Sequence, residues 1–167
     1  MNYSEFQQEI KDLVRSTLYD QAKPADPTLI ALRSDGKQVV VNMGSVFNNR
    51  RIFTQVALPV LCQAIEPRFL AFIAEADIYD GPPPTMPQGN ETLHQWAERA
   101  GVLDKLKEIV IISFSDGTPD EVCYAEINRE PLRLGEWQTM DHTTSQGHMV
   151  GMLSNALRLA KGQKPDA

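Results

Sequence analysis

Cysteine is scarce in this chain of 167 residues, and long apolar runs and an excess of positive charge are missing altogether. Two cysteines, Cys62 and Cys123, cannot make a disulfide framework or a four-ligand zinc site, so each is expected to be a small buried hydrophobic residue. No stretch approaches the roughly 20 apolar residues that a membrane span requires. Lys and Arg number 16 against 22 Asp and Glu, which argues against a nucleic-acid binder with a basic surface.

The beginning of the chain also lacks a targeting signal. Met1–Glu5 has neither the basic region nor the apolar region of a signal peptide. Together with the low cysteine count, this favours a cytoplasmic protein. The content of 42 % hydrophobic residues is too high for a disordered chain, and the length suits one domain, expected at 1–162 with a frayed tail at 163–167.

The familiar catalytic motifs are absent. The chain has no G-x-x-x-x-G-K-[ST] phosphate loop, no G-x-G-x-x-G, no G-x-S-x-G, no H-E-x-x-H and no pair of C-x-x-C motifs. Their absence argues against an enzyme without excluding one, because many active sites have no contiguous signature. No cofactor is expected.

Apolar residues at helical spacing predict a first helix near the N-terminus. Ser4 and Gln7 fit a capping box at its start. The prolines of 22–27 end it, because a residue before proline is pushed out of the helical region. The apolar stripe of this helix consists of Phe6, Ile10, Leu13, Val14 and Leu18.

Three more helices are predicted from the same periodicity and from capping residues. A proline inside the first of these three is expected either to kink it or to break it into two short pieces, and a kink is favoured, because its ring clashes with the preceding turn. They run from Asn48 or Asn49 to about Ala64 with Pro59 inside, from Asn90 to Gly101, and from about Ser145 to Lys161.

A β-hairpin is predicted around Asp35-Gly36, a dipeptide that tolerates the positive φ angles of a type I′ turn. Its strands are Thr28–Arg33 and Lys37–Asn42. Both contain nearly continuous apolar runs, which are typical of strands buried on both faces.

Four further segments have the composition of strands: Phe69–Tyr79, Glu108–Ser115, Glu121–Arg129 and, as an edge strand, Leu132–Gln138. Because hairpin connections dominate, we expect a largely antiparallel sheet of about five to six strands with helices packed against it. The fold class is α+β, in the order α-β-β-α-β-α-β-β-(β)-α.

Glu75 and Asp77 are the first candidates for catalysis. Two residues apart on a strand, both carboxylates lie on one face, at roughly 7 Å between their Cβ atoms. Such a pair can hold a divalent cation or provide a general base. Alternatively, the strand simply leaves the core there and its outer face becomes solvated.

Asp141, His142 and His148 are weak candidates for a metal site, because imidazole and carboxylate groups bind first-row metals. Their spacing matches no recognised ligand pattern, so they also fit an ordinary polar surface. His94, beside Leu93, reads more simply as a boundary residue of its helix.

Other segments suggest binding. Arg50 and Arg51 at a helix start are anion-binding candidates, unless acidic residues of the chain pair with them. Pro83 and Pro84, in the stiff loop 80–89, are interface candidates, although that loop also fits a plain surface connection. Trp137, near the last strand, is an interface candidate too, although most tryptophans belong to the core.

Two function classes remain open. The preferred hypothesis is a non-catalytic module that binds a protein partner or itself, with a homodimer formed at the unpaired edge of 132–138 beside Trp137. The alternative is a divalent-metal-assisted hydrolase that uses Glu75, Asp77, His142 and His148. An acidic mimic is less favoured, because a net charge of −6 over 167 residues is modest.

Overall fold

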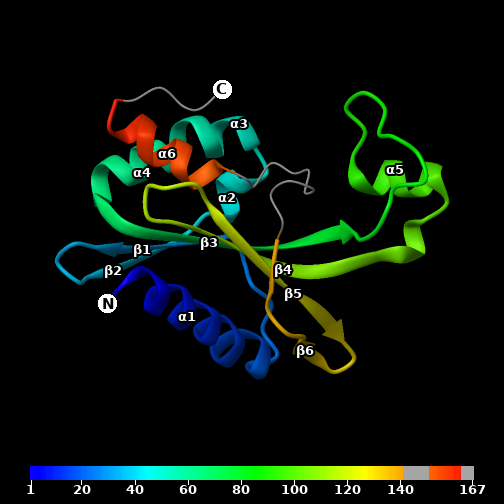
Figure 1. Ribbon diagram of the computed structural model, residues 1–167, viewed down its shortest axis with the longest axis horizontal. Coiled ribbons are helices and arrows are strands. Elements are labelled where there is room, and N and C mark those ends of the chain that lie inside the picture. Colours follow the sequence, from blue (N-terminus) through cyan, green and yellow to red (C-terminus); the bar gives the residue numbers. More distant parts are fainter. Residues whose placement is uncertain (141–150, 163–167) are drawn as a thin grey trace.

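A computed structural model describes residues 1–140 and 151–162 and shows a sheet between two layers of helices (Figure 1). Helix α1 covers one face, and helices α4 and α6 cover the other. The α+β class predicted from the sequence is therefore confirmed.

The described strands form a seven-stranded sheet in the order β2-β1-β3-β4-β5-β6, and β7 also pairs with β5. All paired strands are antiparallel. β2 therefore lies at one edge, while β6 and β7 lie at the other. The strands are β1 (Thr28–Arg33), β2 (Gln38–Asn42), β3 (Pro67–Tyr79), β4 (Leu106–Ser115), β5 (Glu121–Arg129), β6 (Leu132–Leu134) and β7 (Gln138–Thr139).

The helical segments include two π-helical turns and two 3-10 turns as well as α-helices. The α-helices are α1 (Tyr3–Leu13), α2 (Gly44–Phe47), α3 (Arg50–Ile52), α4 (Leu58–Ile65), α5 (Leu93–Ala100) and α6 (Met152–Ala160). The π turns are η1 (Val14–Leu18) and η3 (Phe53–Ala57), and the 3-10 turns are η2 (Tyr19–Gln21) and η4 (Leu103–Lys105).

Helix α1 begins two residues earlier than the sequence predicted. Asn2 is its N-cap, and its side chain accepts the N–H of Glu5 at 2.9 Å. The Glu5 carboxylate in turn accepts the N–H of Asn2 at 2.7 Å. The predicted box of Ser4 and Gln7 is therefore wrong; the observed pair makes the same reciprocal bonds and places a carboxylate at the positive end of the helix.

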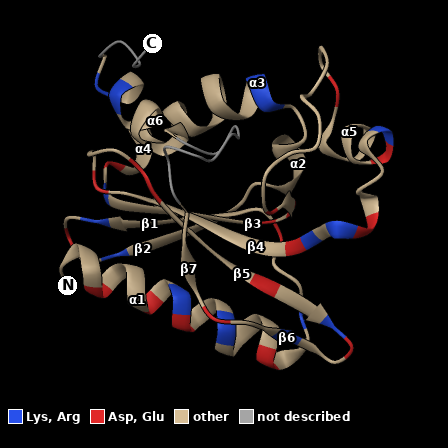
Figure 2. Ribbon diagram, turned by 45° about the vertical axis from the view of Figure 1, so that its right-hand side comes forward, with Lys and Arg blue, Asp and Glu red and all other residues tan. Residues whose placement is uncertain are grey.

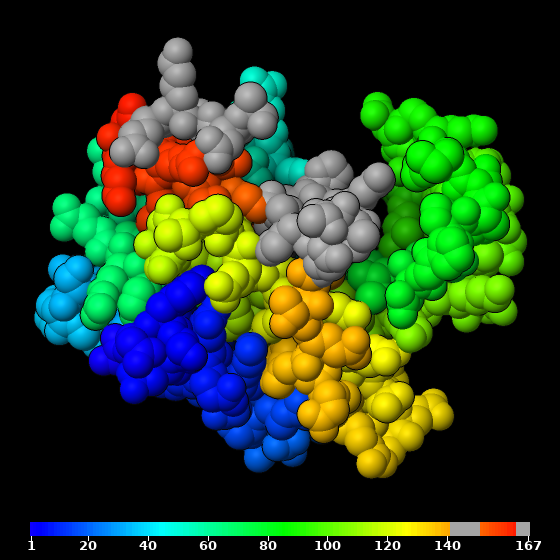
Figure 3. All heavy atoms as spheres, viewed as in Figure 1, coloured from blue at the N-terminus to red at the C-terminus, as the bar shows by residue number. Residues whose placement is uncertain are grey.

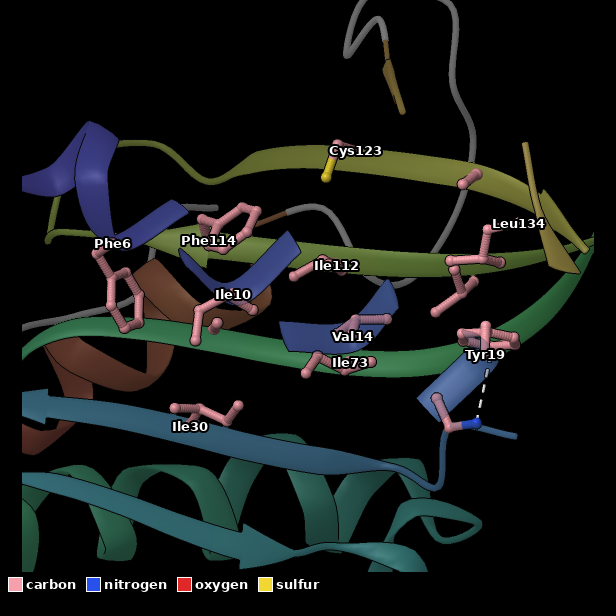
Figure 4. Packing of buried hydrophobic residues seen from close by; sticks show 14 of the residues in the cluster. Phe6, Ile10, Val14, Tyr19, Ile30, Ile73, Ile112, Phe114, Cys123 and Leu134 are labelled. Carbon is pink, nitrogen blue, oxygen red and sulfur yellow. Dashed lines mark hydrogen bonds between the residues drawn. The ribbon is translucent and has the colours of Figure 1, made fainter. Parts of the chain in front are cut away.

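The apolar side of α1 packs on one face of the sheet. Phe6, Ile10 and Val14 are at most 1 % exposed and point toward strand residues such as Ile73 and Ile112 (Figure 4). The next buried residue of the segment is Tyr19, five positions after Val14. The π turn at η1 explains this spacing, because its bonds run from i to i+5 and rotate the following residue onto the core face. Leu13, expected in the stripe, is 39 % exposed.

On the opposite face, α4 and α6 pack over residues such as Leu70 and Phe72, which are fully buried. The helix predicted from Asn49 is present, with the Asn49 side chain accepting the N–H of Ile52. The helical segment does not end at Pro59 but continues to Ile65. The π turn η3 leads directly into α4, and the wider turn leaves room for the proline ring beside the carbonyl that lost its N–H donor.

The β1–β2 hairpin is present, but its turn differs from the prediction. Arg33 donates its N–H to Lys37, and Gly36 donates to Arg33, so three residues form the loop. Of the loop residues, Gly36 has a positive φ, at 83°. This pattern fits a three-residue loop with a glycine at its left-handed position, whereas type I′ needs two positive φ angles.

Burial of the two hairpin strands also differs from the prediction. β1 is buried on both faces, as expected, since its four central residues are all buried. β2 is not, because its residues alternate between exposed and half-buried. β1 has strand neighbours on both sides, whereas β2 has one described neighbour, so the similar apolar composition of the two strands does not give similar burial.

Strands β3 and β4 continue past the main sheet as a two-stranded arm that carries α5. A small separate cluster of Trp96, Ala97 and Val102 packs there. This lobe, green in Figure 3, projects from one side of the molecule. Thr92, rather than the expected Asn90, caps α5 by accepting the N–H of Gln95, because Gln95 completes a capping box with it.

The segment predicted as one strand at 132–138 consists of two short strands, β6 and β7, interrupted at Gly135–Trp137. This interruption raises the number of strands in the described residues to seven. The peptide bond Glu130–Pro131 is cis. Helix α6 belongs to the helix predicted from Ser145 to Lys161; residues 145–150 lie outside the described part of the chain.

Candidate functional site

Glu75, the first catalytic candidate, is bound by two other side chains. Tyr19 donates its hydroxyl to Glu75 Oε1 at 2.7 Å, and the Arg129 guanidinium binds Oε2 at 3.0 Å. Arg129 also binds Glu108 on β4 at 2.6 Å. The resulting network joins η2, β3, β4 and β5, so the contacts of Glu75 hold elements together rather than leave a free base.

Tyr19 is the central residue of this network. It is 1 % exposed, and its hydroxyl also accepts the N–H of Ala25 at 3.3 Å. The dashed line in Figure 4 marks that bond. Burial, followed by the hydrogen bond to Glu75, raises the pKa of Tyr19 above its usual value. The tyrosine therefore stays neutral and acts as a donor to the carboxylate.

Asp77 binds a different partner. His94 Nε2 on α5 lies 2.6 Å from Asp77 Oδ2, so this pair connects the projecting lobe to β3. The His94 side chain is 64 % exposed. Glu75 and Asp77 thus lie on one face of β3, as predicted, but bind different groups.

Residues 1–140 and 151–162 contain no group of three or more His, Cys, Asp or Glu side chains placed to hold an ion. The described part of the chain therefore offers no metal site. Asp141, His142 and His148 lie outside the described residues.

Arg50 and Arg51, the anion-binding candidates, are both exposed on α3. That helix has three residues, and the Asn49 side chain already accepts the Ile52 N–H at its start. The segment therefore provides two charged side chains, but not the set of free backbone N–H groups that a longer helix presents to an anion.

Pro83 and Pro84 are exposed in the loop before α5. The loop is fastened to α5 farther along, where Trp96 Nε1 donates to the Thr85 carbonyl at 2.9 Å. Arg99 also donates to the Met86 carbonyl at 2.9 Å. These bonds hold the loop in one shape and leave the Met86 side chain 67 % exposed.

Trp137, the third interface candidate, is half-buried and packs against the core under α1. The Arg15 guanidinium lies 5.8 Å from the centre of its ring. Arg15 also donates to the carbonyls of Leu134 and Gly135, at 3.0 and 2.7 Å. The β6–β7 edge is therefore short and partly occupied by the chain's own arginine.

The opposite edge, β2, is more open. Val40, the middle residue of β2, is 63 % exposed. Its neighbours Val39 and Val41 are half-buried and pack against the cluster that includes Phe53 and Leu58. An exposed apolar strand at a sheet edge presents unpaired N–H and C=O groups to another chain.

An exposed apolar stripe lies on the helix that follows β2. Ile52, Val56 and Val60, spaced four apart, are 46 %, 54 % and 56 % exposed. Residues four apart lie on one side of a helix. This helical segment, teal in Figure 4, runs behind β1 and β2, which agrees with the packing of Val39 and Val41 against its buried side.

Charge is scarce in this region. From Gln38 to Ile65, 28 residues contain two charged side chains, Arg50 and Arg51, where the chain average of 23 % would give about six. Figure 2 shows α4 without blue or red, whereas α1 and the β3–β4 arm carry both colours. Edge strands are normally protected by charged residues, and cores of interfaces are depleted of them.

We call the outer edge of β2 (Gln38, Val40, Asn42) together with the stripe Ile52, Val56 and Val60 the β2–α4 surface. Sequence reasoning missed it, because the valines of β2 read as buried core. The low charge of the stretch 38–65, with two charged side chains in 28 residues, was the signal that could have revealed it.

The two cysteines are buried, as expected. Cys62 is 3 % exposed and Cys123 is 6 % exposed. Burial raises the pKa of Cys62 to about 12 and that of Cys123 to about 11. Both thiols therefore stay protonated near neutral pH and are poor nucleophiles.

Comparison with protein-family models, with curated proteins and with solved structures finds no match to this chain. None of the helices in the described part is long and apolar enough to cross a membrane.

Proposed function

We propose that this protein is a self-associating module, and that the β2–α4 surface is where two chains meet. The observation that carries the proposal is the exposed, uncharged edge strand with Val40 at its centre. The sequence favours a non-catalytic module that binds a protein partner or itself, and the homodimer predicted from it uses a different edge, 132–138.

The energetics of the surface suit a reversible dimer. Fully burying a valine or isoleucine side chain is worth about 1.5–3 kcal/mol. Val40, Ile52, Val56 and Val60 are 46–63 % exposed, so covering them is worth about 1 kcal/mol each, or roughly 8 kcal/mol for two chains. Association costs about 4–15 kcal/mol, so main-chain hydrogen bonds between the two edges are needed in addition.

The β6–β7 edge supports the proposal less well. Its two strands have three and two residues, and Arg15 already binds the carbonyls of Leu134 at the end of β6 and of Gly135 after it. Trp137 is half-buried against the chain's own core rather than free to anchor a partner. A Trp137→Ala variant is therefore a useful comparison for the position of the contact.

The experiment measures molar mass by light scattering after size exclusion, at micromolar chain concentrations. The wild type is expected to show a mass above the 18.7 kDa monomer that falls on dilution. Val40→Lys is expected to be monomeric, because a charged side chain on the edge opposes pairing. The matched control is Met86→Lys, at a residue with similar exposure (67 %) on the distant loop.

Each result bears on the proposal. A wild type that stays at 18.7 kDa up to about 100 μM would refute self-association, because dimers with micromolar Kd assemble in that range. Dissociation by Trp137→Ala, with Val40→Lys still dimeric, would place the contact at the other edge. Loss of dimer in Met86→Lys as well would show a general effect of added charge.

A further inference from the structure

The backbone of β2 presents a defined set of free groups. Met43 donates its N–H to Pro27 and Arg33 donates to Lys37, which fixes the hydrogen-bonded pairs of the β1–β2 ladder. In an antiparallel ladder, such pairs alternate with pairs whose N–H and C=O point away. Gln38, Val40 and Asn42 therefore direct their backbone groups outward, away from β1.

We propose that two chains pair their β2 strands antiparallel about a two-fold axis through Val40. This inference rests on the proposed self-association and specifies its geometry. Val40 then faces Val40 of the second chain, and Gln38 faces Asn42. The sheets of both chains join into one continuous sheet through the outward N–H and C=O groups.

The side chains of β2 suit this arrangement because they are symmetric about Val40. Reading outward, each direction gives a valine and then an uncharged amide, in the order Gln-Val-Val-Val-Asn. A two-fold axis through the central residue therefore brings like against like without opposing charges. Such an interface is closed, because each edge is used once, and it yields a dimer rather than a fibre.

The helix stripe follows from the same symmetry. A two-fold axis perpendicular to the sheet keeps each face on its own side, so the helical segments 50–65 of both chains lie on the same face of the joined sheet. Ile52, Val56 and Val60 are exposed in each chain. Packing of the two segments across the axis covers both stripes, and this accounts for their exposure in a single chain.

A second copy fits this surface better than an unrelated strand does. An unrelated strand satisfies the edge of β2 but brings no apolar helix for the stripe. A second copy supplies both elements in one rigid body. The six residues of the β2–α4 surface carry no charge themselves, and the charged groups beside them, among them Glu9, which accepts from Gln38 at 3.3 Å, lie outside that set.

The test is site-directed cross-linking with oxidised glutathione in the full-length chain. In the proposed register, the Cα atoms of the two Val40 residues are about 5.5 Å apart, within the range of about 4.4–6.8 Å for a disulfide. Val40→Cys is therefore expected to form a covalent dimer. The wild type is the control, because its cysteines are buried and protonated.

Two further variants test the register. Gln38→Cys alone is expected not to cross-link, because its two copies lie four residues apart along the ladder, roughly 14 Å. A mixture of Gln38→Cys and Asn42→Cys is expected to cross-link.

The contact between the two helical segments is tested by Val56→Lys. This substitution is expected to weaken the dimer by about tenfold or more in Kd, since it places two charges between the helices.

The outcomes separate this inference from the broader proposal. A wild-type dimer with no cross-link in Val40→Cys, or with efficient cross-linking of Gln38→Cys alone, overturns the two-fold axis at Val40 and leaves self-association standing. A monomeric wild type overturns both. An unchanged Kd in Val56→Lys overturns the contact between helices.

Discussion

Val40 and Ile30 face each other across the β1–β2 ladder, yet Ile30 is 3 % exposed and Val40 is 63 % exposed. Their side chains lie on the same face of the sheet, where α1 packs. Ile30 belongs to the core cluster under α1, and Val40 does not. The change from core to solvent thus takes place within one strand spacing, at the edge where we propose that a second chain binds.

Gly36 is expected to be required in the hairpin loop, because its φ of 83° is unfavourable for residues with a side chain. Nothing lies within 4 Å of an added Cβ, so the cost is conformational. Gly36→Val is expected to destabilise the chain by about 1–2 kcal/mol, and Gly36→Asn by less. Urea unfolding monitored by circular dichroism measures both; an unchanged free energy of unfolding in Gly36→Val would contradict the turn geometry.

Tyr19→Phe is expected to destabilise the protein by about 1–2 kcal/mol, because the buried hydroxyl donates to Glu75 and accepts from Ala25. Tyr124→Phe is the matched control. Its hydroxyl bonds Gln138 near the surface, so its loss is expected to cost less than about 0.5 kcal/mol. Equal effects of the two substitutions in thermal unfolding would show that the network around Glu75 contributes little.

Asp120 is expected to hold the first turn of α6. It is 3 % exposed, and its carboxylate accepts the N–H groups of Leu153 and Ser154 at 2.9 and 2.8 Å. Asp120→Ala is expected to cost about 1–3 kcal/mol, because two buried donors lose their acceptor. Asp104→Ala, at an exposed position, is the control and is expected to change stability by less than about 0.5 kcal/mol.

The stabilisation that Asp120 provides is expected to decrease as the pH rises. Burial is the main cause that raises the pKa of Asp120, so the ionised form is less favoured in the folded chain than in the unfolded chain. The contribution of Asp120 to stability is therefore largest below its ordinary pKa and declines as the pH rises. The difference between wild type and Asp120→Ala is expected to shrink from about pH 4 to pH 7. A difference that grows over this range would contradict a raised pKa.

Zinc and manganese are expected not to bind with a defined stoichiometry in titration calorimetry at neutral pH. The Glu75 and Asp77 carboxylates already bind Tyr19, Arg129 and His94. Uptake of one ion per chain that disappears in Asp77→Asn or in His142→Ala would instead support the hydrolase hypothesis.

Local sequence patterns were sufficient for the elements themselves. The apolar spacing of Phe6, Ile10 and Val14, the run within 69–79 and the glycine at position 101 each predict an element that the structure contains. These signals act over a few residues, through backbone geometry and capping. They do not show which of several nearby polar residues caps a helix, so the N-caps Asn2 and Thr92 were missed.

Among the candidate residues, the sequence correctly placed Glu75 and Asp77 on one face of a strand. It could not show that Tyr19 and Arg129 bind Glu75, because these residues lie 56 and 54 positions away and meet it through sheet pairing. The burial of Tyr19 depends on a π turn, which the ordinary helical period does not predict.

Periodicity and turn residues act over a few positions, so the sequence specifies the main helices and strands, while the split of 132–138 and the two π turns depend on distant contacts. Which strand lies at an edge follows from the pairing of distant segments. β1 and the valines of β2 are similarly apolar, but burial depends on how many neighbours a strand has and on which helix covers it. Strand order is set by long-range pairing, and it leaves Val40 exposed while its partner Ile30 is buried.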